Sequence, residues 1–312
     1  MGEAQELLDR QRARFAALDP ELPDDVLLPK GDPLLAHLPD GTTVAGVVAH
    51  ARNAPDSVQA LWQPLETYEL FPLVGERSGE GMDGVLRAWR QWLDARSVPG
   101  EDSGCALTWP SRDAAAARAL LDHGFTPLTC MAIRRGGEPD PVTELSGTVK
   151  VRRAGPADLD TVVELALAEH DYAVLVGASV PRPRAAELKR IAARLRLNSA
   201  DDPVWLAEQP DGAPLALAEC GWVDTTRPPG GHRLRPGRWA YVNCLSVHER
   251  ARGRGVGQRL MATAHAEFAR AGAVGSFLHY NPPNPLSSVF WPRQGYRPLW
   301  TTWEVRPATA LR

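Results

Sequence analysis

Two turns of this chain recur at one fixed distance, and this repeat restricts the possible folds more than any other feature of the sequence. A Pro-Asp-Gly turn joins two apolar runs at Asp40 and again at Asp211, 171 positions later. A short helical stretch ends at Gly124 and another ends at Gly295, again 171 positions apart, and an aromatic residue follows each. Because two unrelated landmarks share one offset, we infer an internal duplication, with one domain at 1–140 and the other at 148–312.

Both halves show the same predicted order of elements. A helix is followed by a hairpin, a strand, a helix, a strand, a helix and a last strand or hairpin. Strands that alternate with helices predict an α/β fold, with a twisted mixed sheet flanked by helices in each half. The Pro- and Gly-rich segment 135–141 is the predicted linker between the halves.

Composition narrows the class of protein. A length of 312 residues suits two domains, and a net charge of -3 gives no global attraction to nucleic acid or to anionic lipid. The sequence has no run of about 18 apolar residues, so we expect no membrane span. Its first ten residues carry acidic groups and no apolar core, which predicts a helix in a cytoplasmic protein rather than a secretory signal. The widely spaced cysteines predict buried thiols, with no disulfide and no metal: Cys105, Cys130, Cys220 and Cys244.

The strongest functional signal follows one predicted strand. The run Trp239–Val247 is rich in β-branched and aromatic residues, and it leads into Arg-Gly-Arg-Gly-Val-Gly at 252–257 and then into an amphipathic helix. Glycines let backbone N–H groups turn inward, and a helix N-terminus adds about half a positive charge. The segment 252–257 therefore predicts a diphosphate cradle, although a glycine-rich turn that binds nothing is the alternative. It matches neither a Walker loop nor a Rossmann loop.

Here the sequence resembles a known family. The stretch LSVHERARGRGVGQRL is similar to the acetyl-coenzyme A signature R/Q-x-x-G-x-G/A of the GNAT superfamily, with Arg252, Gly255 and Gly257 at the signature positions. Upstream, VKVRRAGPADLDTVVELA resembles the first strand and helix of the family, so the likeness spans nearly all of 148–306. Downstream, NPLSSVFWPRQGYRPL resembles the next family segment, with these residues in register: Asn284, Ser287, Phe290, Gly295 and Tyr296.

The resemblance implies an acetyl-coenzyme A-dependent N-acetyltransferase whose fourth and fifth strands splay apart around the pantetheine arm. The acceptor amine would then attack the thioester carbonyl directly in a ternary complex. The cofactor-binding residues that the resemblance implies are Leu245, Ser246, Val247, Arg252, Gly253, Arg254, Gly255, Val256, Gly257, Gln258, Asn284, Ser287 and Trp291.

Two positions depart from the family pattern. Trp291 stands where relatives often place a tyrosine as general acid, and an indole N–H donates a hydrogen bond without exchanging a proton near neutral pH. Trp291 then either walls the pocket or packs as a core aromatic. Asn243 stands where many relatives carry a carboxylate base. The remaining candidates for the base, besides a water chain, are Glu219, Tyr241, His248 and Tyr280, of which strand alternation directs Glu219 and Tyr241 toward the cleft.

The N-terminal half keeps the outline without the cradle. At the offset of 171, the arginine and the two glycines of the signature map to Gly81, Gly84 and Leu86. We therefore expect a degenerate copy that completes the acceptor cleft and stabilises the active half. Its glycine-rich segment at 75–84 is an alternative anion site, which neighbouring acidic residues oppose.

Two classes of function follow. The first is an N-acetyltransferase that acts on a small-molecule amine, or on an amine of a peptide or protein. The second is a noncatalytic acyl-coenzyme A sensor, which the departures at Asn243 and Trp291 motivate. Turnover separates the two, because an enzyme releases free thiol when it is offered the right amine and a sensor does not.

Overall fold

The computed structural model of the chain describes residues 2–26, 28–96, 99–137, 149–226 and 233–312, so part of the predicted linker lies outside the described residues. The N-terminal half contains α1 (Gly2–Leu18), β1 (Asp32–His37), β2 (Thr43–Arg52), η1 (Val58–Leu61), β3 (Glu66–Leu73), α2 (Ser78–Asp94), β4 (Ser103–Pro110), α3 (Ala114–Asp122) and β5 (Thr126–Arg135). The C-terminal half contains β6 (Lys150–Arg153), η2 (Pro156–Asp158), α4 (Leu159–Leu175), α5 (Ala185–Leu197), β7 (Val204–Glu208), β8 (Pro214–Asp224), β9 (Arg238–Val247), η3 (Glu249–Ala251), α6 (Val256–Arg270), β10 (Gly275–Tyr280), α7 (Pro285–Arg293), β11 (Arg297–Val305) and η4 (Ala308–Ala310).

The offset of 171 recurs in the structure itself. Helices α3 and α7 are 171 positions apart at both ends, and strands β5 and β11 begin at the same offset. The two hairpin turns match in detail, since Gly41 and Gly212 have φ values of 84° and 85°. In each turn the aspartate side chain accepts a hydrogen bond from the backbone N–H two residues later. The predicted order of elements in the N-terminal half is confirmed.

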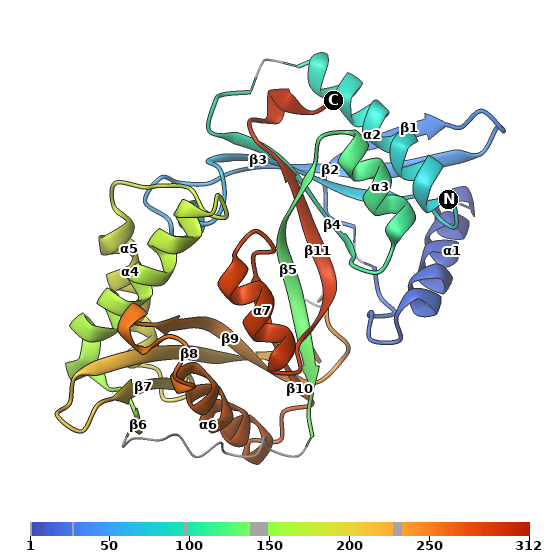
Figure 1. Cartoon of the computed structure of the whole chain (residues 1–312). Helices are drawn as coiled ribbons and strands as arrows, with labels where there is room; N and C mark the ends of the chain where they lie inside the picture. The colour runs from blue at the N-terminus through green and yellow to red at the C-terminus, as the bar shows by residue number, and fades with distance from the viewer. Residues whose placement is uncertain (1, 27, 97–98, 138–148, 227–232) are drawn as a thin grey trace.

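The eleven strands found in the described residues form one continuous mixed sheet, in the order β1-β2-β3-β4-β11-β5-β10-β9-β8-β7-β6. The two halves exchange their last strands: β11 lies between β4 and β5, and β5 lies between β11 and β10. Figure 1 shows β5 and β11 running side by side through the middle of the molecule. The predicted mixed α/β fold with a twisted sheet and flanking helices is confirmed, and the exchange of strands is a feature that the sequence did not indicate.

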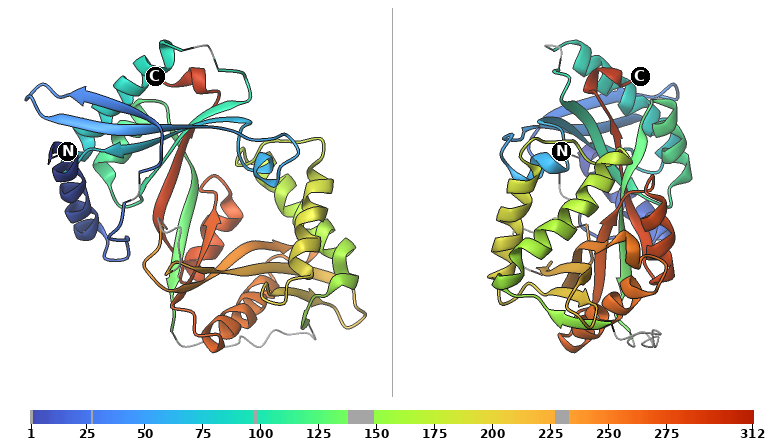
Figure 2. Two further views of the ribbon diagram at one scale, coloured as in Figure 1. Left: turned by 180° about the vertical axis from the view of Figure 1, so that it is seen from behind. Right: turned by 60° about the vertical axis from the view of Figure 1, so that its left-hand side comes forward.

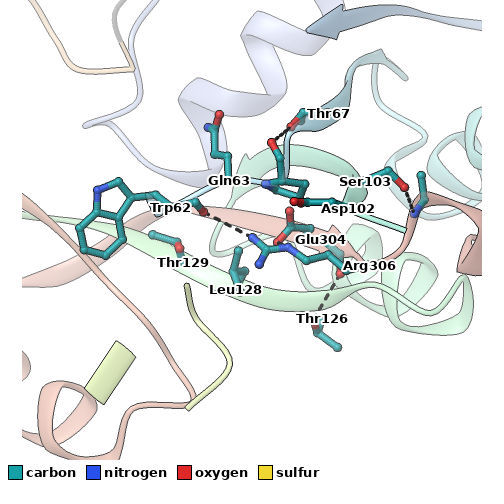
Figure 3. Close-up of polar contacts among 12 residues, drawn as sticks. Trp62, Gln63, Thr67, Asp102, Ser103, Thr126, Leu128, Thr129, Glu304 and Arg306 are labelled. Atoms are coloured by element: carbon teal, nitrogen blue, oxygen red, sulfur yellow. Dashed lines mark hydrogen bonds and ion pairs between the residues drawn. The ribbon is translucent and has the colours of Figure 1, made fainter. Parts of the chain in front are cut away.

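Polar contacts fix the end of the exchanged strand β11 inside the N-terminal half (Figure 3). The Thr126 hydroxyl donates to the carbonyl of Glu304, and Arg306 donates to the carbonyl of Trp62 at 3.4 Å. The Glu304 carboxylate is buried and lies 2.7 Å from the Arg306 guanidinium. Burial raises the pKa of Glu304, and Arg306 opposes that shift. These contacts tie the last strand of the C-terminal half to the other half.

Helices cover both faces of the C-terminal part of the sheet. Alternate residues of a strand point to opposite faces, so Ala216 and Ala218 pack toward α6 whereas Leu217 packs toward α4. Figures 1 and 2 show α4 and α5 on one side of β7–β9 and α6 on the other. The four cysteines are free and buried, as predicted. Within the described ranges, every helix is too short or too polar to cross a membrane.

Candidate functional site

Strands β9 and β10 separate in the middle of the C-terminal half. They pair in parallel from Trp239 to Val242 on β9 and from Gly275 to Leu278 on β10, and the pairing stops there. On its other edge β9 keeps its partner β8, but the register shifts at Asn243, which is the extra residue of a β-bulge. A bulge bends its strand and re-aims side chains. The predicted splay between the fourth and fifth strands of this half is therefore present, and Asn243 marks where it begins.

A glycine loop leads from the end of β9 into α6. Gly253 and Gly255 have φ values of 73° and 76°, a left-handed conformation that side chains other than glycine adopt at a cost of about 1–2 kcal/mol. Gly255 is the N-cap of α6, so the first N–H groups of that helix face the loop without intrahelical partners. The Arg252 guanidinium donates to the carbonyl of Val247 at 3.1 Å, which connects the loop to the end of the strand.

A cavity of about 560 Å³ lies over the splay and the loop. Almost all of the predicted cofactor-binding residues line it, which brings two distant sequence segments together. Arg254 is the exception, because its side chain is exposed and does not border the cavity. The predicted residues in the lining are Leu245, Ser246, Val247, Arg252, Gly253, Gly255, Val256, Gly257, Gln258, Asn284, Ser287 and Trp291.

Asn284 and Ser287 use their polar atoms to start α7. The side-chain Oδ1 of Asn284 accepts hydrogen bonds from the backbone N–H groups of Leu286 and Ser287, as an N-cap does. The Ser287 hydroxyl donates to backbone carbonyls of the same turn. The equivalent residue in the other half, Asp113, caps α3 in the same way. These side chains position the helix beside the cavity.

Trp291 lies between the cavity and the core. Its side chain is only 7% exposed, and it meets Phe290 and Tyr296 edge-on at 5.0 Å and 5.4 Å between ring centroids. It also borders the cavity. The side chain of Trp291 is therefore both a wall of the pocket and a core aromatic, so the two sequence-based interpretations hold together.

Glu219 and Asn243 form a hydrogen-bonded pair. The Asn243 amide donates to the Glu219 carboxylate at 3.1 Å. Asn243 is exposed and lines the cavity, whereas Glu219 is 5% exposed and lies behind it. Glu219 therefore reaches the cavity through Asn243.

Other candidates for the base are less well placed. Tyr241 stacks on Phe277 at 4.8 Å on the side of the splay away from α6, and burial raises its pKa to about 12. Tyr280 borders the cavity, and burial raises its pKa to about 12 as well. The His248 ring accepts from the Arg250 N–H, so it caps the turn after β9, outside the cavity lining.

The sequence analysis missed an acidic residue of this site. Glu169 on α4 lines the cavity, and its carboxylate lies 3.8 Å from the Lys189 ammonium of α5. Burial raises the pKa of Glu169, Lys189 lowers it, and the nearby charge of Glu219 raises it. A polar Glu-His pair inside the apolar run of α4 was the available signal. Trp62 of the N-terminal half covers this cluster, with the Lys189 ammonium 4.6 Å from its ring centroid.

The N-terminal half has a second splay at the equivalent position. Strands β3 and β4 pair in parallel as far as Leu70 and Leu107 and then separate. Helix α1 fills this gap: the Gln11 amide donates to the carbonyl of Pro72 at 3.0 Å and accepts from the N–H of Val74 at 2.8 Å. Pro72 and Val74 lie 171 positions before Asn243 and Leu245, at the strand that borders the open cavity.

The glycine-rich segment of the N-terminal half is helical from Ser78 onward. Gly81 and Gly84, which correspond to the signature positions, lie inside α2. A Cβ atom at Gly81 would come within 2.9 Å of Val74, and one at Gly84 within 2.8 Å of Leu38. The glycines thus let α2 pack closely on the sheet, and the loop that an anion site at 75–84 would need is replaced by helix.

Comparisons with known proteins agree with this architecture. The family model of the acetyltransferase (GNAT) family matches residues 166–296. A GCN5-related N-acetyltransferase from Sphaerobacter thermophilus is 16% identical, with a TM-score of 0.53, over 90% of this chain and 83% of that chain. One from Kribbella flavida is 16% identical (TM-score 0.45, 89% and 90% covered), and one from Ralstonia eutropha JMP134 is 25% identical (TM-score 0.38, 48% and 94% covered). The Sphaerobacter structure shows that the fold is shared over most of the chain.

Proposed function

The C-terminal half of this chain belongs to the GNAT acetyltransferase family, and from this premise we propose that the protein is an N-acetyltransferase that transfers acetyl from acetyl-coenzyme A to an amine. The single observation that carries the proposal is the open cavity over the β9–β10 splay, with the glycine loop and the α6 N-terminus at its edge. Family membership supports acetyl transfer in general terms. The residues and the acceptor are our proposal.

The residues present fit a pantetheine diphosphate. Gly257 in the first turn of α6 is packed so closely that an added Cβ would lie 3.2 Å from Val247 and 3.4 Å from Phe290, so the backbone itself forms this wall. We propose that the diphosphate binds the N–H groups at 255–258 beside Arg252 and that the pantetheine arm runs along Leu245–Val247. A helix N-terminus and a nearby arginine favour an anion.

Acetyl-coenzyme A, when bound, supplies a thioester whose C–S bond breaks as the acceptor nitrogen forms its bond to the carbonyl carbon. A protonated acceptor amine loses two protons in all: one passes to a base before the attack, and one ends on the leaving sulfur. The chain's own contribution is to hold the two reactants together and to accept the first of these protons. We propose that Glu169, which borders the cavity, accepts it together with Glu219, which lies behind Asn243 and accepts a hydrogen bond from it.

Trp291 and Tyr241 have supporting roles in this proposal. Trp291 shapes the cavity beside the reacting groups, and its indole does not transfer a proton. Tyr241 stays protonated near neutral pH because of its raised pKa, so it does not serve as a base.

The N-terminal half, in this proposal, is a degenerate copy of the same domain that binds no coenzyme. It contributes Trp62 over the Glu169–Lys189 pair and, through the exchanged strand β5, a direct neighbour for β10. We keep the proposed boundaries of 1–140 and 148–312 for the two copies, and we propose a cytoplasmic location. We propose a small-molecule amine as the acceptor, with an amine of a peptide or protein as the alternative.

A noncatalytic sensor of acyl-coenzyme A is the second candidate, because Asn243 and Trp291 replace a carboxylate and a tyrosine at two positions of the family pattern. The deciding experiment titrates the purified protein with acetyl-coenzyme A by calorimetry and then assays free thiol with a panel of amines. Binding with thiol release supports the enzyme. Binding without release from any amine supports the sensor, and absence of binding contradicts both.

A further inference from the structure

A second cavity, of about 460 Å³, lies beside the cofactor cavity. Its walls come from α1, from Pro23, Asp25, Val26 and Leu28, and from strands of both halves, while α6 and α7 contribute none of its described lining residues. Aromatic side chains dominate the lining: Phe15, Phe71, Trp109, Phe277 and Trp300. A cavity of this size with aromatic walls has the character of a small-molecule site.

His279 connects the two cavities. It is the one residue, among those that the structure describes, that lines both of them. It follows Leu278, the last residue of β10 that pairs with β9, so it stands at the opening of the splay opposite Asn243. A ligand in the second cavity would therefore reach the splay at His279.

We propose that the second cavity binds the body of the acceptor, and that this acceptor is a primary amine with an aromatic or apolar group. The inference rests on the proposed acetyltransferase function and names the substrate class of the same site. The amine reaches the splay past His279, where Asn243 and the carboxylates of Glu169 and Glu219 lie. The apolar group stays among the aromatic side chains of the second cavity.

The charges of the cavity favour this class over a polycation. Among the described residues of the lining, Asp25 and Arg233 are the two with a formal charge, and Arg233 is paired with Glu69 at 3.0 Å. The His279 ring is neutral near pH 7, because desolvation and the charge of Arg233 lower its pKa to about 4. A polyamine would leave several ammonium groups without carboxylate partners here, at a large desolvation cost. An arylalkyl primary amine such as 2-phenylethylamine carries one positive charge near neutral pH, and that charge lies at the splay.

The first test compares two acceptors, 2-phenylethylamine and spermidine, on the full-length protein with coenzyme A or acetyl-coenzyme A present. We expect calorimetric binding of 2-phenylethylamine and a kcat/KM for thiol release at least tenfold above that for spermidine. Efficient release with spermidine and little with 2-phenylethylamine would overturn the inference and leave the acetyltransferase function intact. Absence of thiol release with every amine would count against the acetyltransferase function. In that case calorimetric binding of 2-phenylethylamine would still support the second cavity as a site for this class of amine, and absence of binding would overturn it.

The second test places the acceptor by substitution. Leu28 lines the second cavity and is 38% exposed, so Leu28→Trp fills the cavity without disturbing the core. We expect the KM for 2-phenylethylamine to rise at least tenfold, with unchanged kcat and unchanged affinity for coenzyme A. Leu35→Trp on β1, at a leucine that is 66% exposed and borders neither cavity, is the matched control. Equal KM values for the two variants would show that the acceptor lies elsewhere.

Discussion

In the C-terminal half, β9 and β10 separate over an open cavity of about 560 Å³, whereas in the N-terminal half β3 and β4 separate over the buried side chain of Gln11. Separation of two strands leaves backbone N–H and C=O groups without their ladder partners, and buried groups of this kind need other partners. In the N-terminal half, the Gln11 side chain of α1 supplies these partners to the carbonyl of Pro72 and to the N–H of Val74. The two splays thus differ in what occupies them: β9 and β10 border the open cavity, whereas Gln11 of α1 pairs with the separated strand in the other half, where Gln11 and Pro72 also border the second cavity.

The segment that leads from the splayed strand into the next helix also differs between the two halves. In the C-terminal half a loop with two left-handed glycines precedes α6, and in the N-terminal half the equivalent residues already belong to α2. Helix α2 therefore begins at Ser78, about two turns earlier in the aligned numbering than α6 at Val256.

The glycine loop gives the largest effect. In Gly255→Glu a side chain enters the left-handed N-cap of α6, and its carboxylate faces the proposed diphosphate position. We expect affinity for coenzyme A to fall at least a thousandfold, about 4 kcal/mol, by calorimetry. Gly212→Glu is the matched control, because Gly212 has φ 85° and open space around it in the hairpin turn. Undiminished affinity in Gly255→Glu, or an equal loss in the control, would contradict the proposed cradle.

The carboxylate pair comes next. Glu169→Gln removes a proton acceptor, and we expect kcat to fall about a hundredfold, with unchanged affinity for coenzyme A. A carboxylate accepts a proton only when it is ionised, and the pKa of Glu169 is raised above its usual value by burial and by Glu219, with Lys189 in opposition. The rate should therefore fall as the pH is lowered through this raised pKa. Cys244, which also borders this cluster, stays a neutral thiol because burial raises its pKa well above the usual value.

The pH profile separates catalysis from structure. We expect Glu169→Gln to lose the acid limb of the kcat profile, since the group that titrates is gone. Glu187→Gln is a control on the neighbouring helix α5, where the carboxylate pairs with Arg184 at the surface. An unchanged acid limb in Glu169→Gln would assign the proton to another acceptor, such as a water chain.

The closed cleft of the N-terminal half gives a smaller effect, on stability. Gln11→Ala leaves two backbone groups in the β3 splay without partners, and each buried unsatisfied group costs about 1–3 kcal/mol. We expect the free energy of unfolding in urea to fall by about 2 kcal/mol, while the protein still binds a single coenzyme A. Gln5→Ala is the control, since Gln5 contacts only Asp9 on the exposed side of α1. A second bound coenzyme A in Gln11→Ala would show that the Gln11 side chain is what closes this half.

Sequence patterns predicted the repeat, the order of elements in the N-terminal half and the glycine loop, because each depends on local signals such as turn residues and periodicity. The predicted order was wrong for the start of the C-terminal half, where β6 precedes the first helix and a second helix, α5, precedes the hairpin. The exchange of β5 and β11 was not predictable in this way. Each of these strands has the same local pattern whether it pairs within its own half or with the other half. Glu169 was missed for a related reason, since its role depends on Glu219 and Lys189, which come from elements far away in sequence. Arg254 was assigned to the site because it lies in the motif, yet its side chain is exposed outside the cavity.

The smallest expected effect concerns Trp291, where this chain departs from the family pattern. If the indole only shapes the cavity, Trp291→Phe keeps an aromatic ring against Phe290 and Tyr296 and should change kcat by less than about fivefold, or 1 kcal/mol. Phenylalanine has no N–H, so this substitution also removes any hydrogen bond that the indole gives to a reacting group. Trp291→Ala is the comparison: it empties part of the wall, so both kcat and the affinity for coenzyme A should fall. A thousandfold loss of kcat in Trp291→Phe, about 4 kcal/mol, would mean that the indole N–H takes part in the reaction, and the open cleft would then owe its activity to the residue that departs from the family pattern.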